Sequence, residues 1–505
     1  MPNRSSRHRR ASTGRRLVST VGIVAVLTLV TGCTLPWLQF GYSSTHTGFN
    51  DSDHFLTLAD LGAGTTFHQA WTVTLPATAD GPPVVTSVHT ASGWIDLAIV
   101  TTKFGDLQAR DLATGAVRWT ISFPAGTCRI NRGSTRCYTT SSPVIVGSAV
   151  YTYGLDGKVH KIDLATGTQI TSGGWPVTTT LKPWDEKGSS ALSSATGADG
   201  HTYVYAVHSG YPGDRGDYQG HLVAIDTATA ATRVFNTLCS DQAVLFAAAP
   251  AAPDCSEVTS GVWARAGTLY DPRSDRLFFT TGNATYSPSA HHWGDSVLAL
   301  RPDASGVLGG PVDSFTPSNY QQLQDLDQDL GSTLPALLPA PAGSTVSDLG
   351  IQGGKEQQLY LLNLADLSGQ HGPGHTGGQI QQLAVPQGGL VFSAPAVWTN
   401  PADGRIWVFV GTSGGLSGLT VDLGAGNVPK LTPRWQNTQS PATSPIVDNG
   451  VLIAMGANTI GAFDPTTGTR VWNAAVNGTH WQSPIVTSGQ LVFADDSGHL
   501  SLWKL

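Results

Sequence analysis

The chain has 505 residues, a formal net charge of −7 and only 12% charged residues, beside 59 Gly and 30 Pro. A negative chain is unsuited to a phosphate backbone, so the composition argues against nucleic acid as a partner. Glycine and proline in these numbers are typical of a turn-dense β protein.

The first 32 residues have the pattern of an export signal. They hold six Arg, no Lys and no acidic residue, and an apolar run extends from residue 17 to residue 30. That run is too short for a stable membrane span, which predicts a signal peptide over residues 1–32. Its removal would take the formal charge from −7 to −13. The pair Arg15-Arg16 hints at twin-arginine export but lacks the flanking residues, so the Sec and Tat routes both stay open.

Cys33 follows Thr31-Gly32, an arrangement that resembles a bacterial lipobox. The resemblance implies that Cys33 becomes the lipidated first residue and anchors the protein on the outer face of the cytoplasmic membrane. The alternative is an ordinary signal peptide followed by an unmodified Cys33. Residues 33–64 are rich in Ser, Thr, Gly and Asp, and we expect them to form a lead-in tether between the lipid and the folded domain.

A phrase of the form Ala-x-Asp-x-x-Thr-Gly-x-x-x-Trp occurs at residues 109–119 and again at 462–472. Such a repeat indicates units that bury their apolar faces against neighbours, as in propellers and solenoids. Each copy predicts four strands: an opening strand that starts at Pro, a β-branched and aromatic strand, a strand that ends at Asp, and an outer strand that starts at Trp. We expect the Asp to bond backbone N–H groups of the turn, and the Trp to wedge one blade against the next.

Opening and third strands together define eight units. They begin near Pro83, Pro143, Ser190, Val262, Leu334, Pro395, Pro445 and Pro484. The last unit stops after its third strand, whereas residues 67–75 look like an outer strand with no blade before them. The simplest interpretation is a ring that closes when this N-terminal strand completes the C-terminal blade, which removes exposed sheet edges. We therefore predict a single domain over residues 65–505, and a monomer.

Four Cys remain beside Cys33, an even number that suits an oxidising compartment. Cys128 and Cys137 bracket a short loop, and Cys239 and Cys255 a longer one. Three pairings are possible. We favour the local pairing, because each pair lies within one insertion between strands.

The units resemble the pyrroloquinoline quinone (PQQ) repeats of quinoprotein dehydrogenases and of bacterial periplasmic propellers. The segments Trp37-Leu38-Gln39-Phe40-Gly41 and His46-Thr47-Gly48-Phe49-Asn50 resemble the lead-in that often precedes the first such blade. The resemblance covers about residues 37–505 and implies an all-β, eight-bladed propeller. It leaves the activity open, because the same repeat serves enzymes and non-catalytic scaffolds.

The same resemblance suggests a candidate cofactor site in the middle blades. Thr280-Thr281-Gly282-Asn283 and the later Trp293-Gly294-Asp295 are similar to the Thr-Gly-Asn and Gly-Asp segments of quinoprotein alcohol dehydrogenases. This implies that Asn283, Trp293 and Asp295 contact a cofactor. Asp325 and Asp327 lie in a stretch similar to the one that holds the family's general base, although alignment places Gln324 at the position of that base.

A calcium site is implied on the same grounds. Asn283 matches the family's ligand, but the segment where its calcium-binding Glu should fall offers Asp214 and Asp217 instead. The family's vicinal Cys-Cys pair is also missing from the sequence. PQQ chemistry needs a cation held by hard oxygen ligands and a carboxylate that takes a proton, so these departures weaken the case for an enzyme.

We therefore favour a lipid-anchored, extracytoplasmic propeller that is non-catalytic and needs no cofactor. It would bind a protein, peptide or glycan through its loop-rich face. The alternative is a dehydrogenase that uses PQQ and calcium to oxidise an alcohol or a sugar.

Overall fold

The computed structural model describes residues 34–62, 65–126, 128 and 136–505. Residues Thr34–Leu505 form one compact unit. The predicted signal peptide and Cys33 lie outside the described residues. In the part of the chain that is described, no helix combines the length and the apolar character needed to cross a membrane.

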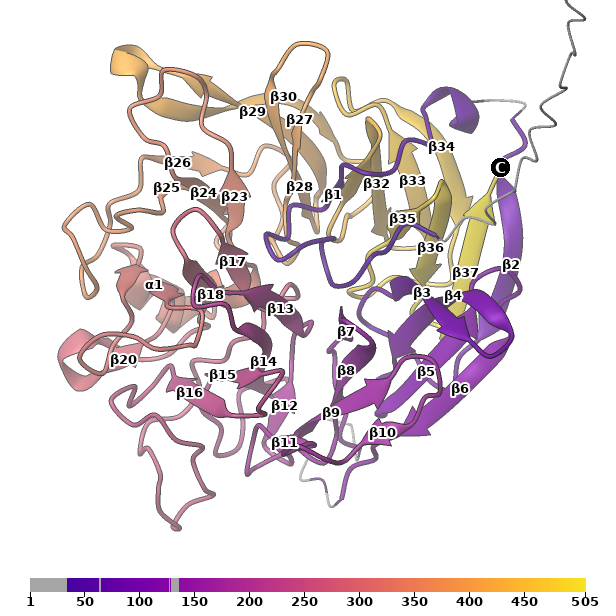
Figure 1. The fold of residues 1–505 in the computed structure, drawn as a ribbon. Helices are drawn as coiled ribbons and strands as arrows, with labels where there is room; N and C mark the ends of the chain where they lie inside the picture. Colours follow the sequence, from indigo (N-terminus) through magenta and orange to yellow (C-terminus); the bar gives the residue numbers. More distant parts are fainter. Residues whose placement is uncertain (1–33, 63–64, 127, 129–135) are drawn as a thin grey trace, which may run out of the picture. The chain divides into compact units, whose positions relative to one another are not determined.

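The described unit is an eight-bladed β-propeller with very little helix, as predicted (Figure 1). With the inner strand first, blade 1 consists of β3 (Val84–Thr90), β4 (Gly93–Thr101), β5 (Asp106–Asp111) and β6 (Val117–Ser122), and blade 2 of β7 (Val144–Val146), β8 (Ala149–Gly154), β9 (Lys158–Asp163) and β10 (Gln169–Ile170), with β11 (Val177–Thr178) also paired to β9. Blade 3 starts with β12 (Glu186–Gly188) and β13 (Ser193–Thr196), both paired to β14 (Thr202–Gly210), and continues with β15 (His221–Asp226) and β16 (Thr232–Asn236). Blade 4 consists of β17 (Leu269–Asp271), β18 (Arg276–Thr280), β21 (Val297–Leu300) and β22 (Asp313–Phe315).

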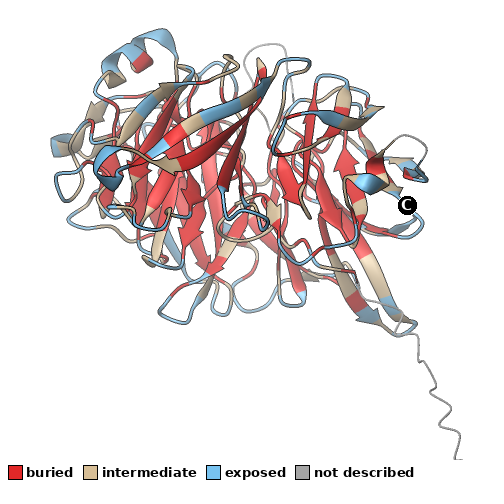
Figure 2. Ribbon diagram, turned by 90° about the horizontal axis from the view of Figure 1, so that it is seen from above, coloured by how far each residue is buried: buried red, intermediate tan, exposed pale blue. Residues whose placement is uncertain are grey.

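The second half of the ring is more regular. Blade 5 consists of β23 (Ala336–Leu338), β24 (Leu349–Gln352), β25 (Gln358–Asn363) and β26 (Gln381–Ala384), and blade 6 of β27 (Ala396–Thr399), β28 (Ile406–Thr412), β29 (Gly415–Leu423) and β30 (Pro429–Asn437). Blade 7 consists of β31 (Ile446–Asp448), β32 (Val451–Gly456), β33 (Thr459–Phe463) and β34 (Arg470–Ala475). Blade 8 consists of β35 (Ile485–Thr487), β36 (Gln490–Ala494), β37 (His499–Lys504) and β2 (His68–Thr74). Figure 2 shows buried residues concentrated in the strands and exposed residues in the connecting loops.

The repeated phrase forms a hairpin turn and a wedge. Asp111 Oδ1 accepts hydrogen bonds from the Thr114 backbone N–H (2.9 Å) and hydroxyl (2.8 Å). From the outer strand of blade 1, the Trp119 indole donates to the Leu164 carbonyl of blade 2 over 3.1 Å. A Cβ built on Gly167 would lie 2.5 Å from the Trp119 ring, so the glycine of the turn makes room for the neighbouring indole.

The first and last strands of the ring are paired. β2 runs antiparallel to β37, from His68 opposite Lys504 to Thr74 opposite His499, and the two ends of the colour scale lie side by side in Figure 1. Trp71 of β2 donates to the Leu112 carbonyl of blade 1 over 3.0 Å, which is the same contact that joins blades 1 and 2. The pairing expected from the sequence is therefore present, and its role in keeping the ring closed stays a prediction.

Residues 34–56 do not form the tether that their composition suggested. Trp37 and Phe40 are buried, and β1 (Phe49–Asn50) pairs in parallel with β31. The backbone of this N-terminal segment bonds the first strands of four further blades, through Trp37 to Val85, Leu38 to Ile145, Ser44 to Tyr270 and Thr47 to Val397. It is the indigo trace that crosses the inner strands in Figure 1. The segment packs against the ring and does not form a free tether, because burial of its large apolar side chains between the blades is favourable.

Both disulfides join the partners that local pairing predicted. Cys128 is bonded to Cys137, and Cys239 to Cys255. Each bond closes a single long insertion of the ring, and such a bond contributes about 2 to 4 kcal/mol by the chain-entropy estimate.

Candidate functional site

A cavity of about 400 Å³ opens where the loops of blades 2 to 6 and 8 meet. It is lined by Tyr138, Thr140, Lys187, Ser209, Gly210, Tyr211, Pro212, Gly213, Asp214, Tyr218, Gly261, Trp263, Arg265, Asn283, Asp327, Asp329, Lys355, Phe392, His480 and Trp481. Several of these residues come just before an inner strand.

Aromatic rings form one wall of the cavity. Phe392 lies between Trp263 and Trp481, with ring centroids 6.0 Å and 5.0 Å away. A cation covers each indole: Lys355 Nζ lies 5.3 Å from the centroid of the Trp263 ring, and Arg265 Cζ 4.1 Å from that of the Trp481 ring. A neighbouring cavity of about 200 Å³ shares Arg265, Phe392, His480 and Trp481 with it, so these side chains line both cavities.

Buried Lys187 and half-buried Arg265 meet at Ser189. Lys187 Nζ donates to the Ser189 hydroxyl over 3.0 Å, and Arg265 to the Ser189 carbonyl over 3.4 Å. Burial lowers the pKa of Arg265 to about 10 while Asp80 opposes this, so the guanidinium stays charged at neutral pH. Burial and the nearby Arg265 together lower the pKa of Lys187 to about 7.

A third cation, Lys355, is paired with acids on the opposite side. It forms an ion pair with buried Asp329 and another with exposed Asp327, the latter at 3.0 Å. Burial raises the pKa of Asp329, although Lys355 opposes this. Burial also opposes the charge of Lys355, but the two carboxylates outweigh it and raise its pKa. The ammonium of Lys355 is thus held in its charged form.

The residues predicted from the Thr-Gly-Asn resemblance are only partly brought together. Asn283 lines the cavity, and its backbone N–H donates to Asp329 Oδ1 over 2.8 Å. Trp293 and Asp295 lie behind the wall: the Trp293 indole donates to the Ser240 hydroxyl over 2.8 Å, and Asp295 Oδ1 accepts the Leu330 N–H over 3.0 Å. The second oxygen of Asp295 is buried without a described partner, and burial raises the pKa of this carboxyl well above its usual range.

The acidic run, which the resemblance linked to a general base, begins in a short helix, α1 (Tyr320–Leu326). Asp325 is exposed there and accepts a hydrogen bond from Gln321. Asp327 reaches the cavity only at its rim. The buried carboxylate at this place is Asp329, which the alignment of the sequence did not select.

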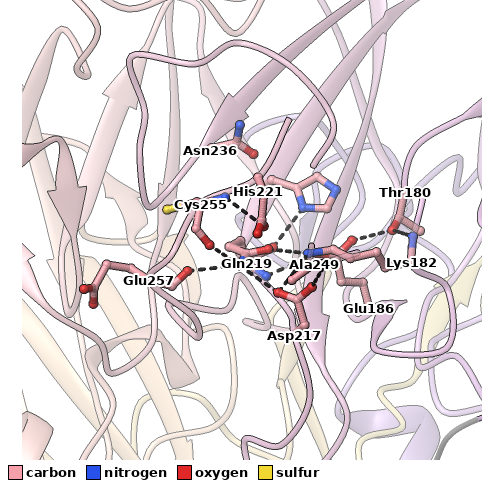
Figure 3. Close-up of polar contacts among 12 residues, drawn as sticks. Thr180, Lys182, Glu186, Asp217, Gln219, His221, Asn236, Ala249, Cys255 and Glu257 are labelled. Atoms are coloured by element: carbon pink, nitrogen blue, oxygen red, sulfur yellow. Dashed lines mark hydrogen bonds and ion pairs between the residues drawn. The ribbon is translucent and has the colours of Figure 1, made fainter. Parts of the chain in front are cut away.

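The three predicted metal ligands do not converge. Asp214 lines the cavity beside Asn283 and accepts the Tyr218 hydroxyl over 2.7 Å. Asp217 faces another region, where it lies 3.5 Å from the buried Lys182 (Figure 3). Lys182 is also 3.3 Å from Glu186, so its ammonium has two carboxylate partners. Asp217 Oδ2 further accepts the Ala249 N–H over 2.8 Å and so fixes the disulfide-bonded loop.

Another group at the edge of the cavity has the residue types of a metal site. Ligand atoms of Asp80, His480 and Asp496 all lie within 4.8 Å of one another. Lys103 Nζ lies 3.4 Å from Asp80 and 3.6 Å from Asp496. An ammonium therefore already supplies the positive charge between these carboxylates, and we interpret the group as an ion-pair cluster.

Comparison with protein families gives one match. Residues 63–233 match the profile of the family PQQ_2, described as outer membrane protein assembly factor BamB. The match covers the first three blades. A search of curated proteins gave no match.

Solved structures with the same fold are similar to nearly the whole propeller. The quinohemoprotein alcohol dehydrogenase ADHIIG of Pseudomonas putida HK5 is 14% identical with a TM-score of 0.64, covering 93% of this chain and 80% of that one. A europium-containing methanol dehydrogenase is 14% identical with a TM-score of 0.62, covering 93% and 98%. The quinohemoprotein alcohol dehydrogenase of Comamonas testosteroni is 14% identical with a TM-score of 0.63, covering 93% and 80%. At this identity the likeness shows the fold alone.

Proposed function

We propose that this protein is an extracytoplasmic, lipid-anchored binding protein that takes a small anionic ligand with a flat apolar part. The observation that supports this most is the cavity itself, in which Arg265 and Lys187 face an aromatic wall. Its volume of about 400 Å³ suits a small molecule or one acidic residue of a peptide or glycan. The anchor and the export rest on the sequence pattern of residues 1–33.

The charge of the ligand follows from the way the cations are paired. Lys355 is neutralised by Asp327 and Asp329. Within the described ranges, neither Lys187 nor Arg265 forms an ion pair, and Asp80 acts on both only at longer range. A ligand carboxylate beside Arg265 would supply the missing counter-charge, and the Trp481 ring offers a flat surface next to it.

Binding is best tested by calorimetry with a panel of aromatic and aliphatic carboxylates on the purified protein. We expect at least one carboxylate to bind, and Arg265→Met to weaken it by about 10-fold to 100-fold, since hydrogen bonds to charged groups contribute about 1.5 to 3 kcal/mol. The control is Lys158→Met, whose ammonium pairs with Asp156 outside the cavity. Equal affinity in the wild type and in Arg265→Met would show that the cavity is not the site.

A PQQ-dependent dehydrogenase is the second candidate, because Asn283 and the buried carboxylate Asp329 meet at the cavity. The lining fits an acidic, flat quinone through its cations and aromatic rings. It fits a calcium ion less well, since Asp217 faces elsewhere and Asp329 is already paired with Lys355. When bound, the quinone would supply the acceptor for the two electrons of alcohol oxidation, with Asp329 placed to hold a proton.

The two candidates are separated by adding PQQ and calcium to the protein. The dehydrogenase predicts a quinone absorbance that co-elutes with the protein, dye reduction with simple alcohols, and loss of both in Asn283→Ala. The binding protein predicts carboxylate binding without dye reduction. If PQQ does not bind at saturating concentration, the dehydrogenase is excluded.

A further inference from the structure

Lys187 is a buried lysine whose described partners are hydroxyl groups. It lies on β12, lines the cavity and is 6% exposed. Its Nζ bonds the Ser189 hydroxyl (3.0 Å) and the Thr140 hydroxyl (3.3 Å). In the part of the chain that the structure describes, no carboxylate forms an ion pair with it. Burial without a counter-charge disfavours an ammonium and favours the free amine.

Among the charged groups around Lys187, Arg265 has a larger effect on its pKa than Asp80. Arg265 approaches through Ser189, and its positive charge opposes protonation of the amine. Asp80 favours protonation but acts from a distance, and the Tyr138 ring covers the amine with its centroid 5.7 Å away. On the neighbouring strand β14 lies His208, which burial holds in its neutral form by lowering its pKa well below the usual range. The adjacent Glu186 pairs with Lys182 instead.

Two other lysines, buried Lys182 and half-buried Lys355, show what a counter-charge changes. Lys182 is 3.3 Å from Glu186 and 3.5 Å from Asp217. Lys355 is paired with Asp327 and Asp329. Both carry acids that stabilise the ammonium, whereas Lys187 carries an arginine beside it. A desolvated lysine next to a second cation is the arrangement that makes an amine nucleophilic.

We propose that Lys187 is a carbonyl-reactive amine, and that the cavity captures an oxo acid through an imine to Lys187 with the acid's carboxylate on Arg265. This rests on the proposed anion-binding function and names its ligand class. The free amine adds to the carbonyl carbon and forms a C–N bond, while the carbonyl electron pair moves to oxygen. The oxygen then leaves as water with both amine protons, and a C=N bond to Nζ remains.

Reductive trapping tests this on the intact protein. Glyoxylate is the probe, and sodium cyanoborohydride supplies the hydride that reduces the imine to a carboxymethyl amine. Peptide mass mapping should find one carboxymethyl group on Lys187, formed about tenfold faster at pH 7 than on Lys355 or on surface lysines, whose ordinary pKa is about 10.4. The labelling rate should rise with pH through a midpoint near 7. Labelling that is uniform over the lysines, or that avoids Lys187, would overturn the proposal.

Two variants and a second anion separate the steps. Lys187→Arg removes the primary amine and should abolish the single fast label. Arg265→Met should slow labelling by glyoxylate about tenfold more than it slows labelling by acetaldehyde, which has no carboxylate and responds only to the changed protonation of the amine. Malonate has no reactive carbonyl and reports anion binding alone. Malonate binding without a fast label defeats only the imine, whereas loss of both defeats the anion-binding function as well.

Discussion

Carboxylates in this propeller occupy two contrasting environments. In the turns, Asp111 accepts bonds from Thr114 and lies 2.5 Å from Arg118, and these partners overcome burial and lower its pKa. In the hairpin between β31 and β32, Asp448 is buried and neither of its oxygens has a hydrogen-bond partner among the described residues. Burial, reinforced by Asp53, raises the pKa of Asp448 to about 9. The same side chain is therefore stabilising in one place and costly in the other.

Replacing the buried acid should stabilise the protein. An unfolded Asp has a pKa of about 3.9, so between about pH 4 and pH 9 the folded state must bind a proton that the unfolded state releases. Stability is therefore highest below this range and falls as pH rises through it. We expect Asp448→Asn to raise the free energy of unfolding by about 2 kcal/mol at pH 7.5, with the gain disappearing near pH 4. Melting temperatures measured across this pH range test it.

The turn acid gives the opposite result and serves as the comparison. Because its folded pKa is lowered, its contribution is present above the unfolded pKa and is lost as pH falls through the folded value. We expect Asp111→Asn to lower the free energy of unfolding by about 1 kcal/mol at pH 7.5 and to have little effect near pH 2. If the two variants had the same pH profile, the assignment of environments would be wrong.

At the scale of elements, the outer strand of one blade is joined to the turn of the next. Trp119 lies against Gly167 and donates to Leu164, and Trp435 lies in the same way against Gly468. The contact of Trp119 could be predicted from the sequence because its Trp and its Gly belong to a repeated phrase, in copies from neighbouring blades. The cavity could not, since Lys187, Arg265 and Lys355 come from three blades and carry no shared local pattern. The sequence signal that comes nearest to finding these three residues is their positive charge, because the chain has few basic residues.

The wedge predicts different results for two glycines with similar backbones. Gly167 has φ +70 and the Trp119 ring at 2.5 Å, whereas Gly173 has φ +65 and nothing within 4 Å. We expect Gly173→Ala to cost about 1 kcal/mol from the left-handed backbone alone. Gly167→Ala should cost about 1 to 3 kcal/mol more, because the indole has to move. Chemical denaturation measures both, and equal losses would refute the wedge.

The whole molecule depends on contacts between distant parts of the chain. The units were predictable largely because six of the eight blades have an inner strand that starts directly after a Pro, as β7 does after Pro143. The packing of residues 34–56 was not, because polar composition hid the few side chains that matter, among them Trp37 and Phe40. Burial of these two large aromatic rings stabilises the packed segment although most of its residues are polar. Only the three-dimensional structure shows which residues pack against the two rings.

Removing the strand that completes the last blade should destabilise the ring. We expect deletion of residues 66–75 to leave the edge of β37 unpaired and to give an insoluble or aggregating product. Sedimentation and thermal melting of the purified variant test this, with Trp71→Ala as a milder change that keeps the strand but removes its bond to Leu112. A soluble deletion variant that melts cooperatively would show that the ring does not need this strand.

The pairing of β2 with β37 also constrains the order in which the protein folds. His68 pairs with Lys504, which is synthesised 436 positions later. The N-terminal strand therefore has no partner until the last blade exists, and contacts of such long separation form slowly. Because the chain is synthesised from its N-terminus, β2 stays unpaired while all the other blades are synthesised. Chaperone demand should thus be greatest late in synthesis, immediately before the two ends meet.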